Sequence, residues 1–148
     1  MRQSKVDHIG IIVRDLDAAA AFLTQVFGLE PAGIEPNEGV RARFFQAGPI
    51  TIQVVEDDQR LRGAPVARLD HICLEVDDIG AVMEAGRTFD ADFVWDEPLV
   101  HRGDNRAQFI TDRGGLGVIF QLNDHRGDAT GRQYEVADVE TLSRAMGG

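Results

Sequence analysis

The chain has few of the features that mark secreted, membrane-spanning or nucleic-acid-binding proteins. Cys73 is its only cysteine, so no disulfide can form within the chain, which is typical of a reducing compartment. No apolar run approaches the ~18 residues of a membrane span, and no apolar segment at the N-terminus resembles a signal peptide. We therefore expect a cytoplasmic protein without a membrane partner. Because Cys73 lies within an apolar run, we also expect its thiol to be buried and unreactive.

Positive charge is scarce as well. Lys5 is the only lysine, and the net charge at pH 7 is −10. A chain this acidic is expected to repel nucleic acid and anionic membrane surfaces. The positive charge that remains is almost entirely arginine, which suits bidentate contacts to carboxylate or phosphate groups. A local site for a small anionic molecule therefore stays open.

One sequence pattern occurs twice within a chain whose length and composition suit a single globular domain. The chain has 148 residues, of which 43% are apolar and 27% charged. Residues 6–16 (VDHIGIIVRDL) correspond to residues 69–79 (LDHICLEVDDI), 63 positions later. Each copy places a histidine in an apolar run that ends in an acidic helix-start signal. Since half of the chain would be marginally stable alone, we expect two modules that share a core.

Module one, residues 6–57, is predicted to have the order β-α-β-β-β. Asp15 is a suitable N-cap for its helix, and Gly28 is placed to end that helix. The strands are predicted at 6–13, 29–33, 40–46 and 50–55, and the helix at 16–27. Residues 58–67 are polar, contain Gly63 and Pro65, and are predicted to be a linker.

Module two, residues 68–123, repeats this order. Asp78 is predicted to cap its helix, whose propensity Gly80 and Gly86 lower. The strands are predicted at 69–76, 92–95, 106–111 and 117–122, and the helix at 79–88. Together the modules predict an α+β fold in which a cupped, barrel-like mixed sheet encloses a cleft.

A tail, residues 124–148, follows the second module. Residues 124–132 are polar and are predicted to be flexible. Four apolar residues at nearly helical spacing then predict a short amphipathic helix: Val136, Val139, Leu142 and Met146. The sequence leaves open whether this helix packs on its own domain or on a partner subunit. We expect the chain to form a homodimer.

Four polar side chains recur at matched places in the two modules. His8 and His71 lie in the first strands, and Gln53 and Gln121 lie in the last strands. A lone histidine in a strand is more often a hydrogen-bonded core residue than a ligand, and a lone glutamine more often faces solvent. Recurrence of both types favours one shared partner, because a buried amide without one costs about 1–3 kcal/mol. The pattern therefore predicts a metal site with all four side chains as ligands.

These tandem modules, each opening with Asp-His-Ile, resemble the vicinal oxygen chelate superfamily, which includes glyoxalase I, bleomycin resistance proteins and extradiol dioxygenases. The resemblance covers residues 6–123 and leaves the tail outside. Within the superfamily the chain looks most like methylmalonyl-CoA epimerase. The matching stretches are DHIGI at 7–11, NEGV at 37–40, LDHI at 69–72, VDDI at 76–79, DEP at 96–98, NR at 105–106 and GV at 117–118.

The resemblance implies metal ligands at His8, Gln53 and His71, and one divalent ion of cobalt, nickel, manganese, iron or zinc. The family's fourth ligand is a glutamate where this chain has Gln121, and the family's glutamate base corresponds to Ala42. Four neutral ligands would leave the ion its full charge, which would attract an anionic chelating molecule and polarise its vicinal oxygens. Oxygen-activating iron sites use two histidines and one carboxylate, so dioxygenase chemistry is disfavoured.

A catalytic base would have to come from another position. The candidates are Glu38 beside the second hairpin, and His101 or Asp104 in the loop after residues 96–98. Of these, the ordinary pKa of His101 suits general base catalysis best, although surface exposure is the default expectation for a histidine in a polar loop, as it is for His125. Arg106 is expected either to bind a substrate carboxylate or only to brace its hairpin.

We therefore expect a metal-dependent isomerase or lyase that acts through an enolate on a small oxyacid or an acyl-CoA. Two alternatives stay open. One is a glyoxalase-I-like lyase on another substrate, and the other is a non-catalytic protein that binds a small molecule, as resistance proteins do. A base within reach of the metal would favour the enzymes, whereas an aromatic cleft without metal would favour the binding protein.

Overall fold

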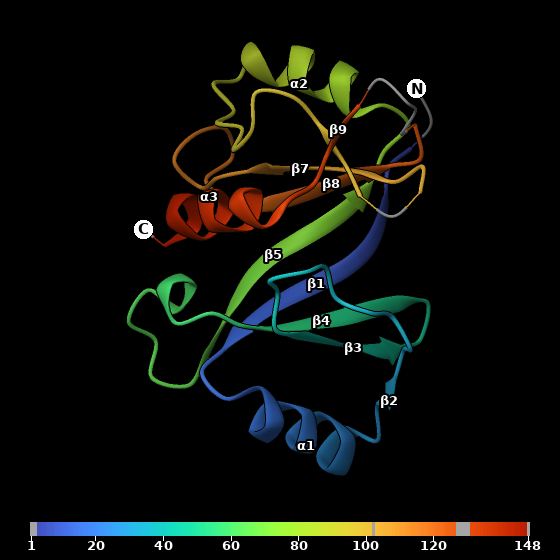
Figure 1. Cartoon of the computed structure of the whole chain (residues 1–148), viewed down its shortest axis with the longest axis vertical. Coiled ribbons are helices and arrows are strands. Elements are labelled where there is room, and N and C mark those ends of the chain that lie inside the picture. The colour runs from blue at the N-terminus through green and yellow to red at the C-terminus, as the bar shows by residue number, and fades with distance from the viewer. Residues whose placement is uncertain (1–2, 102, 127–130, 148) are drawn as a thin grey trace.

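The structure, a computed structural model, describes residues 3–101, 103–126 and 131–147 (Figure 1). Module one contains β1 (Lys5–Val13), α1 (Leu16–Phe27), β2 (Glu30–Pro31), β3 (Ala42–Ala47) and β4 (Ile50–Glu56). A short 3-10 helix, η1 (Gln59–Leu61), lies in the predicted linker. Module two contains β5 (Ala67–Glu75), α2 (Ile79–Arg87), β6 (Leu99–Val100), β7 (Arg106–Ile110) and β8 (Phe120–Asp124). The tail adds β9 (Arg132–Gln133) and α3 (Val136–Met146).

The described strands form one mixed sheet in the order β2-β3-β4-β1-β5-β8-β7-β6-β9. At its centre β1 and β5 are antiparallel, and each is parallel to the last strand of its own module, β4 or β8. Figure 1 shows α1 and α2 at opposite ends of the molecule, with the sheet between them. The predicted α+β fold with a mixed sheet is confirmed. The four central strands are also those that carry the histidines and glutamines selected from the sequence.

The helix boundaries follow the capping signals. Asp15 accepts a hydrogen bond from the Ala18 amide (3.0 Å), and Gly28 ends α1 with a left-handed φ of 69°. Asp78 caps α2 in the same way by accepting from the Gly80 amide (2.9 Å). The two repeated acidic signals therefore begin the two helices that their positions predicted.

The predicted strand at 92–95 is wrong. This segment meets the edge of β7 in a single antiparallel bridge, between Phe93 and Ile110. Trp95 then points into the core, 4% exposed, and the chain turns so that β6 pairs with β7 instead, with β9 at the sheet edge. The β6 and β9 strands, two residues each, carry no alternation long enough to predict them.

Two other predicted strands are shorter or shifted. The strand predicted at 29–33 is reduced to Glu30–Pro31. The strand predicted at 117–122 begins only at Phe120, because Gly117 adopts a φ of 76° that prolongs the turn. Of the predicted flexible segment 124–132, residues 127–130 lie outside the described residues.

The tail helix packs on its own domain. Leu142 and Met146 lie in a buried cluster with Trp95 and Phe109. A hydrogen bond also holds the C-terminal end of this helix, because the Arg62 Nε donates to the Met146 carbonyl (2.7 Å). This resolves the alternatives that the sequence left open and makes the tail part of the core.

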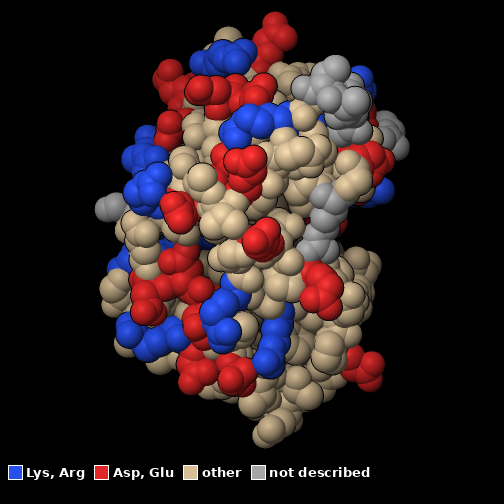
Figure 2. Space-filling view, in the orientation of Figure 1, with Lys and Arg blue, Asp and Glu red and all other residues tan. Residues whose placement is uncertain are grey.

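Two further observations bear on partners. None of the helices in the described part of the chain is long and apolar enough to cross a membrane. On the face shown in Figure 2, carboxylates and guanidinium groups are interspersed, and basic side chains form no continuous patch.

Replacing Leu142 with alanine tests the structural role of the tail. Because Leu142 is 4% exposed among aromatic side chains, we expect Leu142→Ala to lower the free energy of unfolding by about 2–5 kcal/mol. Urea titration followed by circular dichroism measures the change. Val136→Ala on the exposed side of the same helix is the control, with an expected change within about 0.5 kcal/mol. Equal effects of the two substitutions would mean that α3 does not pack in this way.

Candidate metal centre

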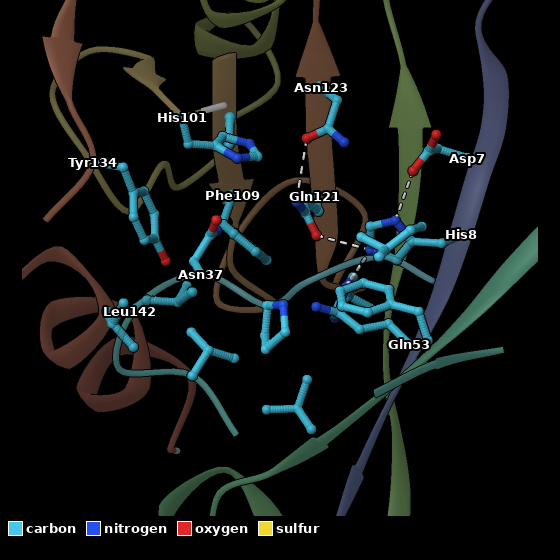
Figure 3. A pocket seen from close by; sticks show the side chains of 18 of the residues that line it. Asp7, His8, Asn37, Gln53, His101, Phe109, Gln121, Asn123, Tyr134 and Leu142 are labelled. Carbon is cyan, nitrogen blue, oxygen red and sulfur yellow. Dashed lines mark hydrogen bonds and ion pairs between the residues drawn. The ribbon is translucent and has the colours of Figure 1, made fainter. Parts of the chain in front are cut away.

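A cavity of about 500 Å³ lies on the concave side of the sheet. Its walls come from the central strands, from the segments around residues 34–41 and 101–105, and from the tail. Figure 3 shows His8, Gln53 and Gln121 on one side of this cavity and His101, Tyr134 and Leu142 on the other. The two sides differ in chemistry.

The four side chains selected from the sequence converge on one side of the cavity. The His8 Nε2 lies 3.1 Å from the His71 Nε2 and 3.0 Å from the Gln121 Oε1. The Gln121 Nε2 donates to the Asn123 Oδ1 (3.2 Å), which directs the Gln121 Oε1 toward His8. The Gln53 Oε1 is buried and has no hydrogen-bond partner among the described residues. Residues that are far apart in the sequence thus bring two imidazoles and two amide oxygens together.

The protonation of both histidines is set by the aspartate that precedes each of them. The His8 Nδ1 lies 2.8 Å from the Asp7 Oδ2, and the His71 Nδ1 lies 2.7 Å from the Asp70 Oδ2. A neutral imidazole that donates from Nδ1 presents a lone pair at Nε2. Burial lowers the pKa of His71 to about 4, against the opposing hydrogen bond to Asp70, so this ring is neutral at pH 7.

This arrangement collects hydrogen-bond acceptors without a donor. The His8 Nε2 lies about 3 Å from both the His71 Nε2 and the Gln121 Oε1, and the Gln53 Oε1 lacks a partner among the described residues. Acceptors at this separation repel one another, and burial without a partner adds a cost of about 1–3 kcal/mol for each group. A cation would satisfy all four atoms. Imidazole nitrogen and amide oxygen are both known metal ligands, and the carboxylates behind the histidines are the usual outer partners of such ligands.

Two β-bulges explain how an aspartate can contact the histidine next to it. Consecutive side chains of a regular strand point to opposite faces. In the pairing of β1 with β5, Val6 lies opposite Leu74 and His8 opposite Cys73, so Asp7 is an extra residue in β1. Asp70 is the corresponding extra residue in β5, between the pairs that His71 and Leu69 make with β1. A bulge redirects side chains locally, and here it turns each aspartate toward its histidine.

The two Asp-His pairs differ in their surroundings. The Asp7 side chain is 46% exposed, whereas the Asp70 side chain is fully buried. Asp70 also forms ion pairs with Arg60 and with Arg68, the latter at 2.9 Å. Burial raises the pKa of Asp70, but the hydrogen bond from His71 and the two arginines outweigh it, and the pKa is lowered overall. The second module therefore holds its histidine in the more rigid frame.

Gly10 leaves the space that the His71 ring occupies. Gly10 pairs with His71 across β1 and β5, and a Cβ at Gly10 would lie 2.0 Å from the His71 Cε1. The corresponding position of module two is Cys73, which pairs with His8. The His71 ring thus requires a residue without a side chain at position 10 of the first copy, and no such requirement applies at Cys73 in the second copy.

A second group of metal-ligating residue types adjoins the first. Asp7, His8 and Cys73 each have one ligand atom within 4.8 Å of the others. The Asp7 carboxylate and the His8 Nδ1 already bond to each other, and burial raises the pKa of the Cys73 thiol well above its usual range. A neutral thiol is a poor metal ligand, so the four residues above form the better site.

Of the three candidate bases, one lines the cavity and two do not. His101 lines the cavity, with its ring 5.8 Å from that of Tyr134. Glu38 and Asp104 are exposed and do not line it. The Ala42 position pairs with Val55 on the same sheet face as Gln53, and its side chain is a buried methyl group that cannot accept a proton.

Arg106 does not line the cavity. Its guanidinium forms a double hydrogen bond with Asp124, at 2.9 and 2.6 Å, and a further one with Asp78 at 3.2 Å. Asp124 in turn accepts from the first amide of α2, at Ile79 (2.7 Å). This geometry fits the bracing role for Arg106 rather than contact with a substrate. His125, on the rim, is exposed as expected and lies 3.1 Å from a Glu75 oxygen.

Several lining residues could not be selected from the sequence. Arg60 comes from the polar linker, and Tyr134 and Leu142 come from the tail, outside the repeat. Asn123 carried the one available signal, because it lies two residues after Gln121 on the same strand face. The others occupy segments without a counterpart in the other module, so comparison of the modules gives no information about them.

The fold and this site define a class of protein. The sequence profile of the Glyoxalase/Bleomycin resistance protein/Dioxygenase superfamily matches residues 7–109, and the chain belongs to that superfamily. No curated protein sequence matches the chain significantly.

Three solved structures have a fold similar to that of this chain. A hypothetical protein from Bacillus halodurans C-125 is 21% identical, with a TM-score of 0.72 over 86% of this chain and 99% of that one. The methylmalonyl-CoA epimerase from Mycobacterium tuberculosis is 22% identical, with a TM-score of 0.67 over 80% and 86%. A variant of the Streptomyces coelicolor methylmalonyl-CoA epimerase, in complex with 2-nitronate-propionyl-CoA, is 26% identical, with a TM-score of 0.68 over 81% and 96%.

A double-mutant cycle tests the contact between Gly10 and His71. Because the added methyl group would overlap the His71 ring, we expect Gly10→Ala to lower the free energy of unfolding by about 1–3 kcal/mol. In a His71→Ala background the same substitution should cost less by about 1 kcal/mol or more, a coupling within the range of about 0.5–3 kcal/mol expected for a direct contact. Chemical denaturation of the four proteins gives the coupling. Identical costs in both backgrounds would show that the His71 ring does not lie over Gly10.

Proposed function

We propose that the chain is a metal-dependent enzyme that holds one divalent ion at His8, Gln53, His71 and Gln121. The observation that carries this proposal is the cluster of four acceptor atoms for which the described part of the chain supplies no donor. When bound, the ion polarises two neighbouring oxygens of a substrate and stabilises negative charge on them. The likeness to methylmalonyl-CoA epimerases supports a substrate that is a small oxyacid or an acyl-CoA. A homodimer stays a prediction.

The residues on the opposite wall would move the proton. A carbon next to a polarised carbonyl loses its proton to a base on one face of the substrate. His101 lines the cavity across from the four ligands, whereas His8 and His71 are held by their aspartates (Figure 3). We assign this proton transfer to His101. Because positions 42 and 121 lack the carboxylates of the epimerases, a single base fits an isomerase or lyase better than a reaction that needs a base on each face.

A non-catalytic binding protein is the second candidate. It is favoured by the aromatic side of the cavity, where Phe109 and Tyr134 both contact the Trp95 ring edge to face. Such a protein would bind the same ligand class without moving a proton. The two candidates therefore differ in proton exchange and not in metal content.

Metal content gives the first test. Protein purified without chelator should carry about one divalent ion per chain, and His8→Ala and His71→Ala should each lose most of it, because each substitution removes one of the two imidazole ligands. Elemental analysis of the purified proteins measures this. Glu38→Gln, outside the cavity, is the control and should keep its metal.

A gain of affinity complements this loss. Gln121→Glu adds a negative ligand and should tighten the site at least tenfold in competition with a chelator. Equal metal content in the wild type and both histidine variants, with no gain for Gln121→Glu, would contradict the site.

Proton exchange gives the second test. In deuterated water the metal-loaded wild type should exchange the C2 proton of methylmalonyl-CoA slowly. His101→Asn should reduce the rate at least tenfold, since loss of a positioned base costs about 10²–10⁴-fold. Ala42→Glu with Gln121→Glu should raise the rate, because it supplies the missing carboxylates. Mass spectrometry follows the exchange, and Asp104→Asn, away from the cavity, is the control. If His101→Asn matches the wild type, His101 is not the base.

A further inference from the structure

The floor of the cavity contains a buried arginine with unused hydrogen-bond donors. Arg60, in η1, is 5% exposed and lines the cavity. Its Nη2 donates to the same Asp70 oxygen that accepts from the His71 Nδ1, so its guanidinium lies just behind the His71 ring. Its Nε is buried and has no hydrogen-bond partner among the described residues. A buried, partly unsatisfied guanidinium is costly unless an anion completes its hydrogen bonds.

The acidic side chains that line the cavity do not fill this need. Each already has a partner elsewhere in the described part of the chain. Asp7 bonds to His8, Glu56 accepts from the Leu16 amide and Arg41, Asp57 accepts from Ser143, and Glu75 lies near His125. Arg41 also lines the cavity, but its side chain is exposed and forms an ion pair with Glu56. Arg60 is therefore the buried positive group with capacity left toward a ligand.

Tyr134 supplies a second donor on the far side of the cavity. Figure 3 shows its ring on the wall opposite Gln53, beside Leu142. Its ring is fixed by edge-to-face contact with Trp95 at 5.6 Å. Burial raises the pKa of Tyr134 to about 12 although the charge of Arg60 opposes this, so the hydroxyl remains a donor at neutral pH. Arg60 and Tyr134 both line this cavity, and Arg60 approaches it from behind His71.

We propose that Arg60 and Tyr134 form a second subsite that binds a carboxylate, and that the ligand is a dicarboxylate with an oxygen next to one carboxyl group. This inference rests on the proposed function, because the vicinal oxygens of such a ligand would occupy the metal centre. Its other carboxylate would then accept from the Arg60 guanidinium and the Tyr134 hydroxyl. A cavity of about 500 Å³ is in the range of small-molecule sites and holds a four- or five-carbon diacid with ease.

Lactate and malate separate the two subsites, because both have the chelating 2-hydroxy acid and only malate has a second carboxylate. By isothermal titration calorimetry, the metal-loaded wild type should bind malate at least tenfold more tightly than lactate. Tyr134→Phe should reduce this ratio below threefold and leave the affinity for lactate unchanged. Arg60→Gln should also reduce the ratio below threefold, and only the ratio is compared for this variant because Arg60 also pairs with Asp70 behind His71. Arg41→Gln is the matched arginine control and should keep the full preference. Thermal denaturation verifies that each variant is folded.

Metal-free protein makes the possible failures distinguishable. Succinate lacks the chelating hydroxyl, and in a thermal-shift assay it should raise the melting temperature of the metal-free wild type more than that of Tyr134→Phe. Equal affinities for malate and lactate, both dependent on metal, would overturn the subsite and leave the metal centre intact. A malate preference that needs Tyr134 but no metal would support the subsite and overturn the metal centre. If Arg60→Gln does not fold, Tyr134→Phe alone decides. Absence of binding by either acid to the wild type would overturn the subsite.

Discussion

The site depends on one hydrogen bond that occurs twice, from the Nδ1 of a histidine to the aspartate before it. This bond keeps a proton on Nδ1 and leaves the Nε2 lone pair facing the cavity. Without it, the two imidazoles could satisfy each other by one donating to the other, and Gln121 could pair with either. With it, the described atoms at the centre are all acceptors, and a cation is the partner that suits them. A bulge in each central strand is what allows neighbouring residues to make this contact.

The duplication accounts for the position of the site but not for its details. Pairing β1 with β5 in antiparallel orientation places the two histidines near a pseudo-two-fold axis, and the parallel neighbours β4 and β8 add the glutamines. The surroundings then diverge. Asp70 is enclosed by two arginines, whereas Asp7 is half exposed. Gly10 leaves space for the His71 ring, whereas the corresponding residue of module two, Cys73, has a side chain. The two modules thus have the same strand arrangement but line the cavity differently, and the charged groups Asp70, Arg60 and Arg68 lie behind His71.

These differences explain which features could be predicted from the sequence. The repeat, the helix caps at Asp15 and Asp78 and the apolar strand runs are local signals, and they predicted the mixed sheet and the helix of each module correctly. The strand at 92–95 failed because tertiary packing of Trp95 turned an apolar segment inward instead of along the sheet edge. The four converging side chains were predictable because each has a counterpart in the other module. Arg60, Tyr134 and Leu142 have none, and only the folded chain brings the linker and the tail to the cavity.

The resemblance to the epimerases places Gln121 and Ala42 where that family has glutamates, and this difference bears on the electrostatics of the whole cavity. In a site with a glutamate ligand and a glutamate base, two negative charges lie close to the ion and the substrate. Here Gln121 and Ala42 are neutral, the acidic residues that line the cavity are paired, and Arg60 is buried beside the floor. Coulomb interactions are strong in such partly buried surroundings, so we expect the cavity to favour a more highly charged anion than a carboxylate-containing site would. Under the proposed function, the same neutrality leaves these two positions without the bases on which epimerisation depends. In this proposal, selection for a dianionic ligand and loss of the two-base reaction both follow from one difference in charge.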